Sequence, residues 1–442
     1  MSSDIKTHTF ANGFKVVYQK SDQKIPLTNI AVFCNVGSAY EVDGIRGASH
    51  FVEHMCFKGT HMTKAKELLM QYNKIGAYFN AYTEKRYTAY IINCDDAHAS
   101  ICLNNLADML LHSAFSKKEF AKEQHVVVEE NIRVQDDNQT VLETELEKWY
   151  FSGSSYAHPI DSIEYHPSAT YLKYDDIYKW YKTFYHPSNM LCSIVSTLPF
   201  SQIISMMKKT DFIEKTPIIA NEIGLPYPER MLTPASCAYV FLKKKISATI
   251  INLGFRICGY TSHDKYVIKV LKHILNGFSG RLFTAFRTTH GLTYRSSCVT
   301  LHHEHAGYIS IHLQTDPRKL MRDGARVGVI PILFRLIADL QKHGVTAEEV
   351  HNAKGNSKGA DLISMQSTDH VAEYNGVEAI LNESESIVPY GTLYDNYIAP
   401  ITKADVNRMI KKYIRKDNMI FGMIDEKGIS RTMVEKMISG LQ

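Results

Sequence analysis

The chain has 442 residues, of which 45% are hydrophobic and 22% are charged, and its 50 Lys+Arg against 46 Asp+Glu give a formal net charge of +4. This composition excludes a disordered or fibrous protein, and it gives no electrostatic reason to expect binding to nucleic acid or to an acidic membrane. At roughly 150 residues per domain, the length predicts two or three domains.

No targeting segment is evident, because residues 1–7 are few and polar. The longest apolar window, 327–340, is interrupted by Pro331 and Arg335, and it is shorter than the roughly 20 residues that span a membrane. The eight cysteines form no C-x-x-C pair, which is typical of reduced core thiols in an intracellular protein. We therefore expect a cytoplasmic protein without a membrane segment.

The predicted elements recur in the same order in the two halves of the chain. After a first strand at 14–18, which follows an Asn12-Gly13 turn, the first half shows a strand, a helix and a charged helix, and the second half repeats this series. The series is predicted at 87–92, 99–112 and from Lys117, and again at 308–313, 319–342 and from Thr346. The repetition predicts two similar α+β domains of about 200 residues each.

A segment rich in proline separates the two halves. Four prolines and Gly224 lie between Thr210 and Pro234, where few apolar residues recur with any period. The predicted organisation is an N-terminal domain at 1–210, a linker at 211–234 and a C-terminal domain at 235–442. Each domain is expected to have a mainly antiparallel sheet with helices packed on one face.

The strongest local motif is the H-x-x-E-H string within the segment 47–54. On a helix, His50 and His54 lie one turn apart on the same face, with Glu53 beside them, so the two imidazoles can hold one metal ion. Zinc suits such a pair because imidazole is one of its usual ligands, and a catalytic zinc keeps one position for water. The motif also arises by chance in up to about one such chain in ten, so it needs further support.

A third ligand is expected on a neighbouring helix, in the segment 123–130. Glu123 and Glu130 share a helical face but stand about 10.5 Å apart along its axis, so they are not expected to bind the same ion. The spacing does not choose which of them is the ligand and which is an accessory carboxylate. Glu129 lies about 100° away around the helix and is predicted to be a surface charge.

Several motifs together resemble the inverted-motif zinc peptidases, the family of pitrilysin, insulin-degrading enzyme and the mitochondrial processing peptidase. The resemblance covers most of the chain in the order of the family, at 37–60, 80–83, 123–130, 185–190, 279–283 and 287–294. It implies a zinc endopeptidase, with the two domains forming half of the clamshell chamber of the long family members.

The resemblance also implies roles for individual residues. It makes His50, His54 and Glu130 the ligands of one zinc ion, Glu53 the general base of metal-assisted hydrolysis, and Glu123 the additional catalytic glutamate. Asn80 and Ala81 match the strand along which an extended substrate binds by β-augmentation, and Arg287 and Tyr294 match a pair that contacts the substrate. As alternatives, 80–81 is an ordinary edge strand, and Arg287 and Tyr294 serve only to cap and pack a helix end.

The length suggests that a second chain completes the chamber, as a homodimer or as a heterodimer with a related chain. In that hypothesis Arg287 and Tyr294 of one subunit complete the zinc site of the other. The alternative function is a noncatalytic core or partner subunit of a processing-peptidase-like complex. A presequence-processing protease is less favoured than a general oligopeptidase, because the noncatalytic subunit's glycine-rich loop and an import signal are absent from this sequence.

Two other patterns are interpreted as structural. The cluster His302-His303-Glu304-His305 does not complete an H-E-x-x-H motif and is expected at the end of a hairpin. Cys56, two residues beyond His54, is expected to point away from the ligand face into the core. The sequence has neither of the two glycine-rich nucleotide-binding motifs, G-x-x-x-x-G-K-[ST] and G-x-G-x-x-G.

Overall fold

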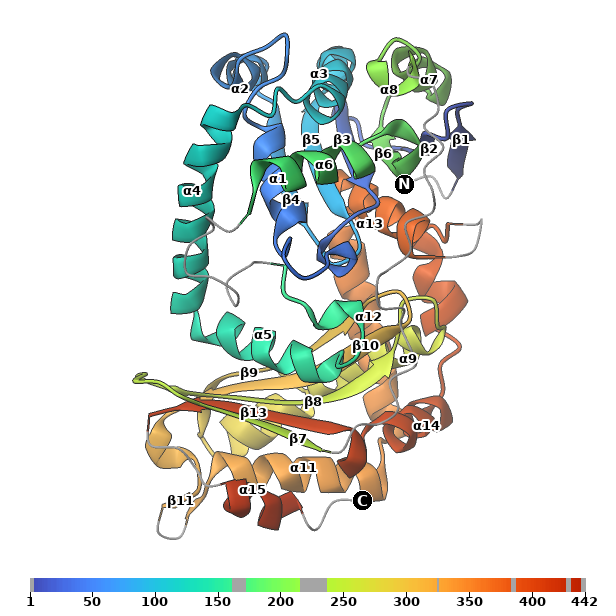
Figure 1. Cartoon of the computed structure of the whole chain (residues 1–442). Helices are drawn as coiled ribbons and strands as arrows, with labels where there is room; N and C mark the ends of the chain where they lie inside the picture. Colours follow the sequence, from blue (N-terminus) through green and yellow to red (C-terminus); the bar gives the residue numbers. More distant parts are fainter. Residues whose placement is uncertain are drawn as a thin grey trace. The chain divides into compact units, whose positions relative to one another are not determined.

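A computed structural model describes residues 4–160, 172–214, 237–323, 326–382, 387–426 and 431–438. The described chain forms two compact units, each built around one sheet (Figure 1). Unit 1 comprises residues 1–133, 158–228 and 362–392, and unit 2 comprises 134–157, 229–361 and 393–442. The α+β class is confirmed, while most of the predicted linker at 211–234 lies outside the described residues and the predicted domain limits stay a prediction.

Unit 1 contains a six-stranded sheet in the order β1-β2-β6-β3-β5-β4. All neighbouring strands are antiparallel except β2 and β6, which are parallel. The strands are β1 (Ile5–Thr9), β2 (Lys15–Lys20), β3 (Leu27–Cys34), β4 (Tyr78–Thr83), β5 (Thr88–Asp95) and β6 (Met190–Ser196). The helices are α1 (Ala48–Cys56), α2 (Ala65–Lys74), α3 (Ala99–Leu111), α4 (Lys117–Asp136), α6 (Tyr174–Phe184), α7 (Phe200–Met207), α8 (Asp211–Glu214) and α13 (Thr368–Leu381).

The alternation of side chains along a strand gives this sheet two buried faces. Along β3, Ile30 and Val32 belong to the main core, which also includes apolar side chains of α1, α3 and α6. Ala31 and Phe33 belong to a second, smaller cluster on the opposite face, against which α13 packs. Burial of each large apolar side chain contributes about 1.5–3 kcal/mol, so both layers stabilise the sheet.

Unit 2 contains a five-stranded sheet in the order β7-β13-β8-β10-β9, and its single parallel pair is β7 with β13. The strands are β7 (Ala238–Lys243), β8 (Thr249–Cys258), β9 (Thr293–His302), β10 (Ala306–Thr315) and β13 (Met419–Asp425), with a separate short pair β11 (Arg322–Asp323) and β12 (Arg326–Val327). The helices are α5 (Asn138–Tyr150), α9 (Asp264–Leu275), α10 (Arg281–Phe283), α11 (Val329–His343), α12 (Ala347–Ser364), α14 (Lys403–Tyr413) and α15 (Arg431–Ile438).

The two sheets have the same topology apart from the extra edge strand β1. In chain order, β2, β3, α1, β4, β5, α3, α4, α5, α6 and β6 correspond to β7, β8, α9, β9, β10, α11, α12, α13, α14 and β13. The predicted repeat is therefore confirmed.

One pair of corresponding helices is exchanged between the halves. α5, from the first half of the sequence, packs on β8 and β13 of unit 2, whereas α13, from the second half, packs on β3 and β6 of unit 1. The colours of Figure 1 show this exchange, with orange α13 beside the blue strands and teal α5 beside the yellow and red strands. A helix from the other half thus covers the second face of each sheet, in addition to the helices predicted on the first.

The other predicted elements agree with the structure in most places. The strands expected at 14–18, 87–92 and 308–313 are β2, β5 and β10, and the helix expected at 99–112 is α3. The helix predicted over 319–342 is wrong in its first part, because residues 322–323 and 326–327 pair as β11 and β12 and α11 begins only at Val329. The backbone of Gly328, just before the helix, is extended. Pro331 lies in the first turn, where an N–H group has no partner within the helix and its absence breaks no hydrogen bond.

Two further predictions concern the cysteines and the absence of a membrane segment. All eight cysteines are free, six of them buried and Cys237 and Cys258 partly buried. Among the described helices, none has both the length and the apolar character that are needed to cross a membrane.

Candidate metal centre and active site

Helix α1 carries the H-x-x-E-H motif, and its first turn is fixed by a buried carboxylate. Glu41 accepts the backbone N–H groups of Gly47 and Ser49, each at 2.7 Å, where the unpaired amides and the helix dipole favour negative charge. Burial raises the pKa of Glu41 to about 7, although these hydrogen bonds oppose the shift. Phe51 and Met55, about 100° around the helix from the two histidines, are fully buried and anchor the helix in the core.

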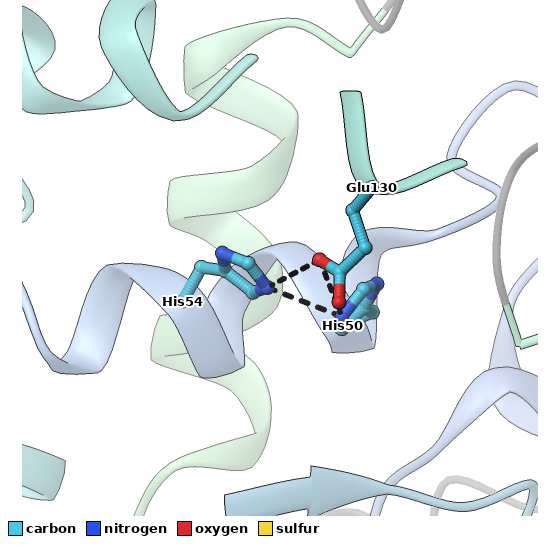
Figure 2. A group of neighbouring side chains, drawn as sticks. All are labelled: His50, His54 and Glu130. Atoms are coloured by element: carbon cyan, nitrogen blue, oxygen red, sulfur yellow. Dashed lines mark hydrogen bonds and ion pairs between the residues drawn. The ribbon is translucent and has the colours of Figure 1, made fainter. Parts of the chain in front are cut away.

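His50, His54 and Glu130 converge on one point in unit 1 (Figure 2). The Nε2 atoms of the two histidines are 3.2 Å apart, and Oε2 of Glu130 lies 3.3 Å from Nε2 of His54 and 3.8 Å from Nε2 of His50. Two ligands at about 2.1 Å from a tetrahedral zinc ion would be about 3.4 Å apart. Two imidazoles and one carboxylate at these separations fit zinc and leave room for a fourth ligand.

The structure separates the two carboxylates of α4 that spacing left equivalent. Glu130 points toward the two histidine Nε2 atoms, whereas Glu123 lies behind His54, with Oε2 3.1 Å from Nδ1. When Nδ1 donates its proton to Glu123, Nε2 keeps its lone pair for a metal ion. Burial favours the protonated form of Glu123, but its contacts with His54 and Lys58 outweigh this effect and lower its pKa. Glu129 is exposed, as predicted.

Glu53 is buried beside the metal-binding group and has one defined hydrogen-bond partner. The hydroxyl of Thr83, at the end of β4, donates to Oε2 of Glu53 at 2.6 Å. Burial raises the pKa of Glu53, and the neighbouring Glu130 adds to this, although His50, Thr83 and His54 oppose it. A carboxylate with a raised pKa is a better proton acceptor than an ordinary glutamate.

Asn80 and Ala81 lie on β4, which is an edge strand of the first sheet. Its inner side pairs with β5, where Asn80 is opposite Ile91 and Ala81 is opposite Tyr90. The N–H of Ala81 donates to Oδ1 of Asn80 at 2.9 Å. Because β4 ends at Thr83, which contacts Glu53, this edge strand leads directly to the candidate base.

Arg287 and Tyr294 belong to unit 2, so they lie in a different compact unit from the metal-binding group. Arg287 lies on a π-helical segment, Thr284–Thr289, and its exposed guanidinium is 5.5 Å from the ring centre of Phe283. Tyr294 is the second residue of β9. Their predicted roles in substrate binding stay predictions.

Two family profiles match consecutive parts of the chain. The profile described as insulinase, peptidase family M16, matches residues 15–161, and the profile described as the peptidase M16 inactive domain matches residues 171–357. The chain belongs to peptidase family M16. The resemblance inferred from the motifs is therefore confirmed.

Relatives of this M16 chain include bacterial and mitochondrial proteins. It is 29% identical to an uncharacterized zinc protease of Bacillus subtilis, YmxG, over 85% of this chain and 88% of the relative. It is 21% identical to a probable mitochondrial-processing peptidase subunit beta of Arabidopsis thaliana, over 93% of this chain and 76% of the relative. A solved protease structure from Helicobacter pylori has the same fold, with a TM-score of 0.86, 20% identity and coverage of 96% and 99% of the two chains.

Sequence reasoning missed two residues of the M16 site, Lys58 and Thr83. Both lie inside segments that carry the resemblance, Lys58 four residues after His54 and Thr83 three residues after Asn80, but neither was given a role. Their contacts with Glu123 and Glu53 join distant segments, so no local pattern could reveal them.

The two structural interpretations are confirmed. Residues 302–306 connect β9 to β10, and Cys56 is fully buried. Among the described residues, His50, His54 and Glu130 are the only group of histidines, cysteines and carboxylates with metal-binding geometry.

Proposed function

We propose that this chain is a zinc-dependent endopeptidase that cleaves peptides bound in an extended conformation. The observation that carries the proposal is the convergence of two imidazole nitrogens and one carboxylate oxygen beside the buried carboxylate of Glu53. His50, His54 and Glu130 would hold the zinc ion, and the names of the bacterial relatives as zinc proteases support this assignment. Bound zinc would supply a Lewis acid that polarises a peptide carbonyl and lowers the pKa of water.

The other side chains of the site have separate roles in the proposed reaction. Glu53 accepts the proton of the attacking water and delivers it to the leaving amine, while the Thr83 hydroxyl holds one of its oxygens in place. Glu123 orients His54 and balances positive charge at the site. Asn80 and Ala81 offer the free edge of β4, along which an extended peptide can add as a further strand.

A second chain completes the chamber in this proposal, as a homodimer or a heterodimer. The similarity to a processing-peptidase subunit supports a paired assembly, because that relative is named as one subunit. Arg287 and Tyr294 would contact the substrate, acting across the dimer. The cytoplasmic location stays a prediction from the sequence.

The decisive experiment replaces Glu53 by Gln. We expect the Glu53→Gln variant to bind zinc like the wild type but to lose cleavage of a quenched fluorescent peptide by about 10²-fold or more, because the general base is gone. Glu129→Gln is the matched control, since this glutamate of α4 is exposed and its replacement should leave both properties unchanged. Wild-type cleavage by Glu53→Gln would contradict the assigned role.

A noncatalytic core or partner subunit is the second candidate. It is favoured by the match of residues 171–357 to a domain described as inactive. Zinc analysis with and without chelator, combined with the same cleavage assay, distinguishes the two. A wild-type chain that binds zinc but cleaves no peptide between about ten residues and a folded protein would support the second candidate.

A further inference from the structure

Lys58 contacts the buried carboxylate that orients one of the proposed zinc ligands. Its Nζ atom is 2.6 Å from Oε1 of Glu123, and the other oxygen of that carboxylate is 3.1 Å from Nδ1 of His54. The Glu123 side chain is only 4% exposed. Lys58, Glu123 and His54 therefore form a continuous chain of contacts from the ammonium group to the imidazole ring.

The backbone fixes Lys58 relative to helix α1. The N–H of Lys58 donates to the carbonyl of Met55 at 3.1 Å, which continues the last turn of the helix. Gly59 then has a φ of +98°, and a Cβ atom there would lie 2.9 Å from the backbone nitrogen of Ala65, so the turn requires glycine. The lysine is thus presented to Glu123 from a defined position.

The charges of the site indicate what this lysine is needed for. Three carboxylates, Glu53, Glu123 and Glu130, surround two histidines that must be neutral to bind metal. One divalent ion balances two of the three negative charges. Among the described residues, Lys58 pairs with one of these carboxylates, Glu123. Its single positive charge balances the third negative charge.

We propose that Lys58 is a positioning residue for the metal centre, which holds Glu123 in the orientation that directs Nε2 of His54 toward the zinc ion. This inference rests on the proposed function only in taking zinc as the ion. Without the ammonium group, Oε1 of Glu123 loses its partner and the carboxylate can rotate away from His54. Groups that orient a metal-bound histidine typically contribute about 10- to 100-fold in metal affinity.

The test measures zinc affinity of the full chain by competition with a chromophoric chelator, without any peptide. We expect Lys58→Met to weaken zinc binding by about 10- to 100-fold and Lys58→Arg to restore most of it. Lys122→Met is the matched control, because Lys122 is an exposed lysine of α4 that pairs with Glu119 at 2.7 Å. Its zinc affinity should equal that of the wild type.

A double-variant cycle separates positioning from a general effect on folding. If Lys58 acts through Glu123, then Lys58→Met should weaken zinc binding no further in a chain that already carries Glu123→Gln. Unchanged zinc affinity of Lys58→Met, or equal losses in both backgrounds, would overturn the proposal. A wild-type chain that fails to bind zinc would instead contradict the proposed function.

Discussion

The two units share one topology, but their corresponding helices carry different side chains. Helix α1 of unit 1 and helix α9 of unit 2 occupy equivalent positions, as do α4 and α12. The motif of His50, Glu53 and His54 on α1 has a counterpart with the same spacing on α9, formed by Lys269, Lys272 and His273. Unit 1 thus has imidazole and carboxylate groups in this motif, whereas unit 2 has two lysine ammonium groups and one imidazole.

An ion pair joins α9 to α12 in unit 2. Nζ of Lys269 lies 2.6 and 2.8 Å from the two carboxylate oxygens of Asp361 on α12, the helix that corresponds to α4 of unit 1. Burial lowers the pKa of His273 to about 4, and the nearby Lys272 and Lys269 add to this effect. In unit 2 an ammonium group of the chain itself thus lies between α9 and α12 and balances the charge of Asp361.

The comparison is tested most directly by giving α9 of unit 2 the H-x-x-E-H motif that α1 has in unit 1. We expect the double variant Lys269→His/Lys272→Glu to bind two zinc ions per chain instead of one, because it places two imidazoles and the Asp361 carboxylate in the arrangement of unit 1. The measurement is metal analysis after dialysis, with zinc titration to find the second, weaker affinity.

Two controls accompany that measurement. Lys272→Glu alone should stay at one zinc, because Lys269 still occupies the centre beside Asp361. The double variant must also show the circular dichroism of the wild type. A folded double variant that still binds a single zinc would show that the two helix pairs are not equivalent in geometry.

The sequence could predict those features that depend on local spacing. That His50 and His54 lie on one face of a helix follows from the helix period alone. The choice between Glu123 and Glu130 does not, because it depends on how α4 crosses α1, and that crossing is set by packing between segments about 70 residues apart.

Features that depend on long-range packing could not be predicted. Nothing in the periodicity of α5 or α13 shows which sheet each helix covers, since neither has a strong apolar stripe and the buried face of α13 includes Asn375, Gly376 and Glu378. The pairing of Lys269 with Asp361, separated by 92 residues, was likewise invisible before the topology was known.

The ion pair of unit 2 provides a second test, with a smaller effect. We expect Lys269→Met to lower the free energy of unfolding of unit 2 by about 2 kcal/mol, because it leaves the carboxylate of Asp361, 11% exposed, without its ammonium partner. The two tryptophans make the measurement specific, since Trp149 lies in unit 2 and Trp180 in unit 1. Urea unfolding is followed by the fluorescence of Trp149 in a Trp180→Phe background.

The matched control for this variant is an ion pair at the start of the same helix α9, whose cations are on α14. Lys412→Met removes an ammonium group from Asp264 at the start of α9, but Arg408 still pairs with that carboxylate at 3.2 Å. Its loss should cost less than about 1 kcal/mol, as for exposed ion pairs. Equal losses of unfolding free energy in the two variants would show that the Lys269 and Asp361 pair stabilises unit 2 no more than an exposed ion pair does.

The exchanged helices α5 and α13 extend the comparison to the other face of each sheet. In unit 1 the close approach relies on a glycine of the helix, because a Cβ atom at Gly376 would lie 2.0 Å from the ring of Phe33. In unit 2 it relies on a glycine of the sheet, because a Cβ atom at Gly254 would lie 1.9 Å from the hydroxyl of Tyr150. The glycine that allows the close contact is therefore on the helix in unit 1 and on the sheet in unit 2.

Replacing Gly376 by Ala tests whether this contact stabilises unit 1. We expect Gly376→Ala to lower the free energy of unfolding by about 1–3 kcal/mol, since the added methyl group must displace the fully buried ring of Phe33. The fluorescence of Trp180 in a Trp149→Phe background reports on unit 1. Gly359→Ala in helix α12 is the control, because its Cβ atom would meet nothing within 4 Å, and higher helix propensity should stabilise unit 2 by about 0.5–1 kcal/mol. If Gly376→Ala proves as stabilising as Gly359→Ala, then α13 does not pack on Phe33 in solution, and the exchange of helices in unit 1 is wrong.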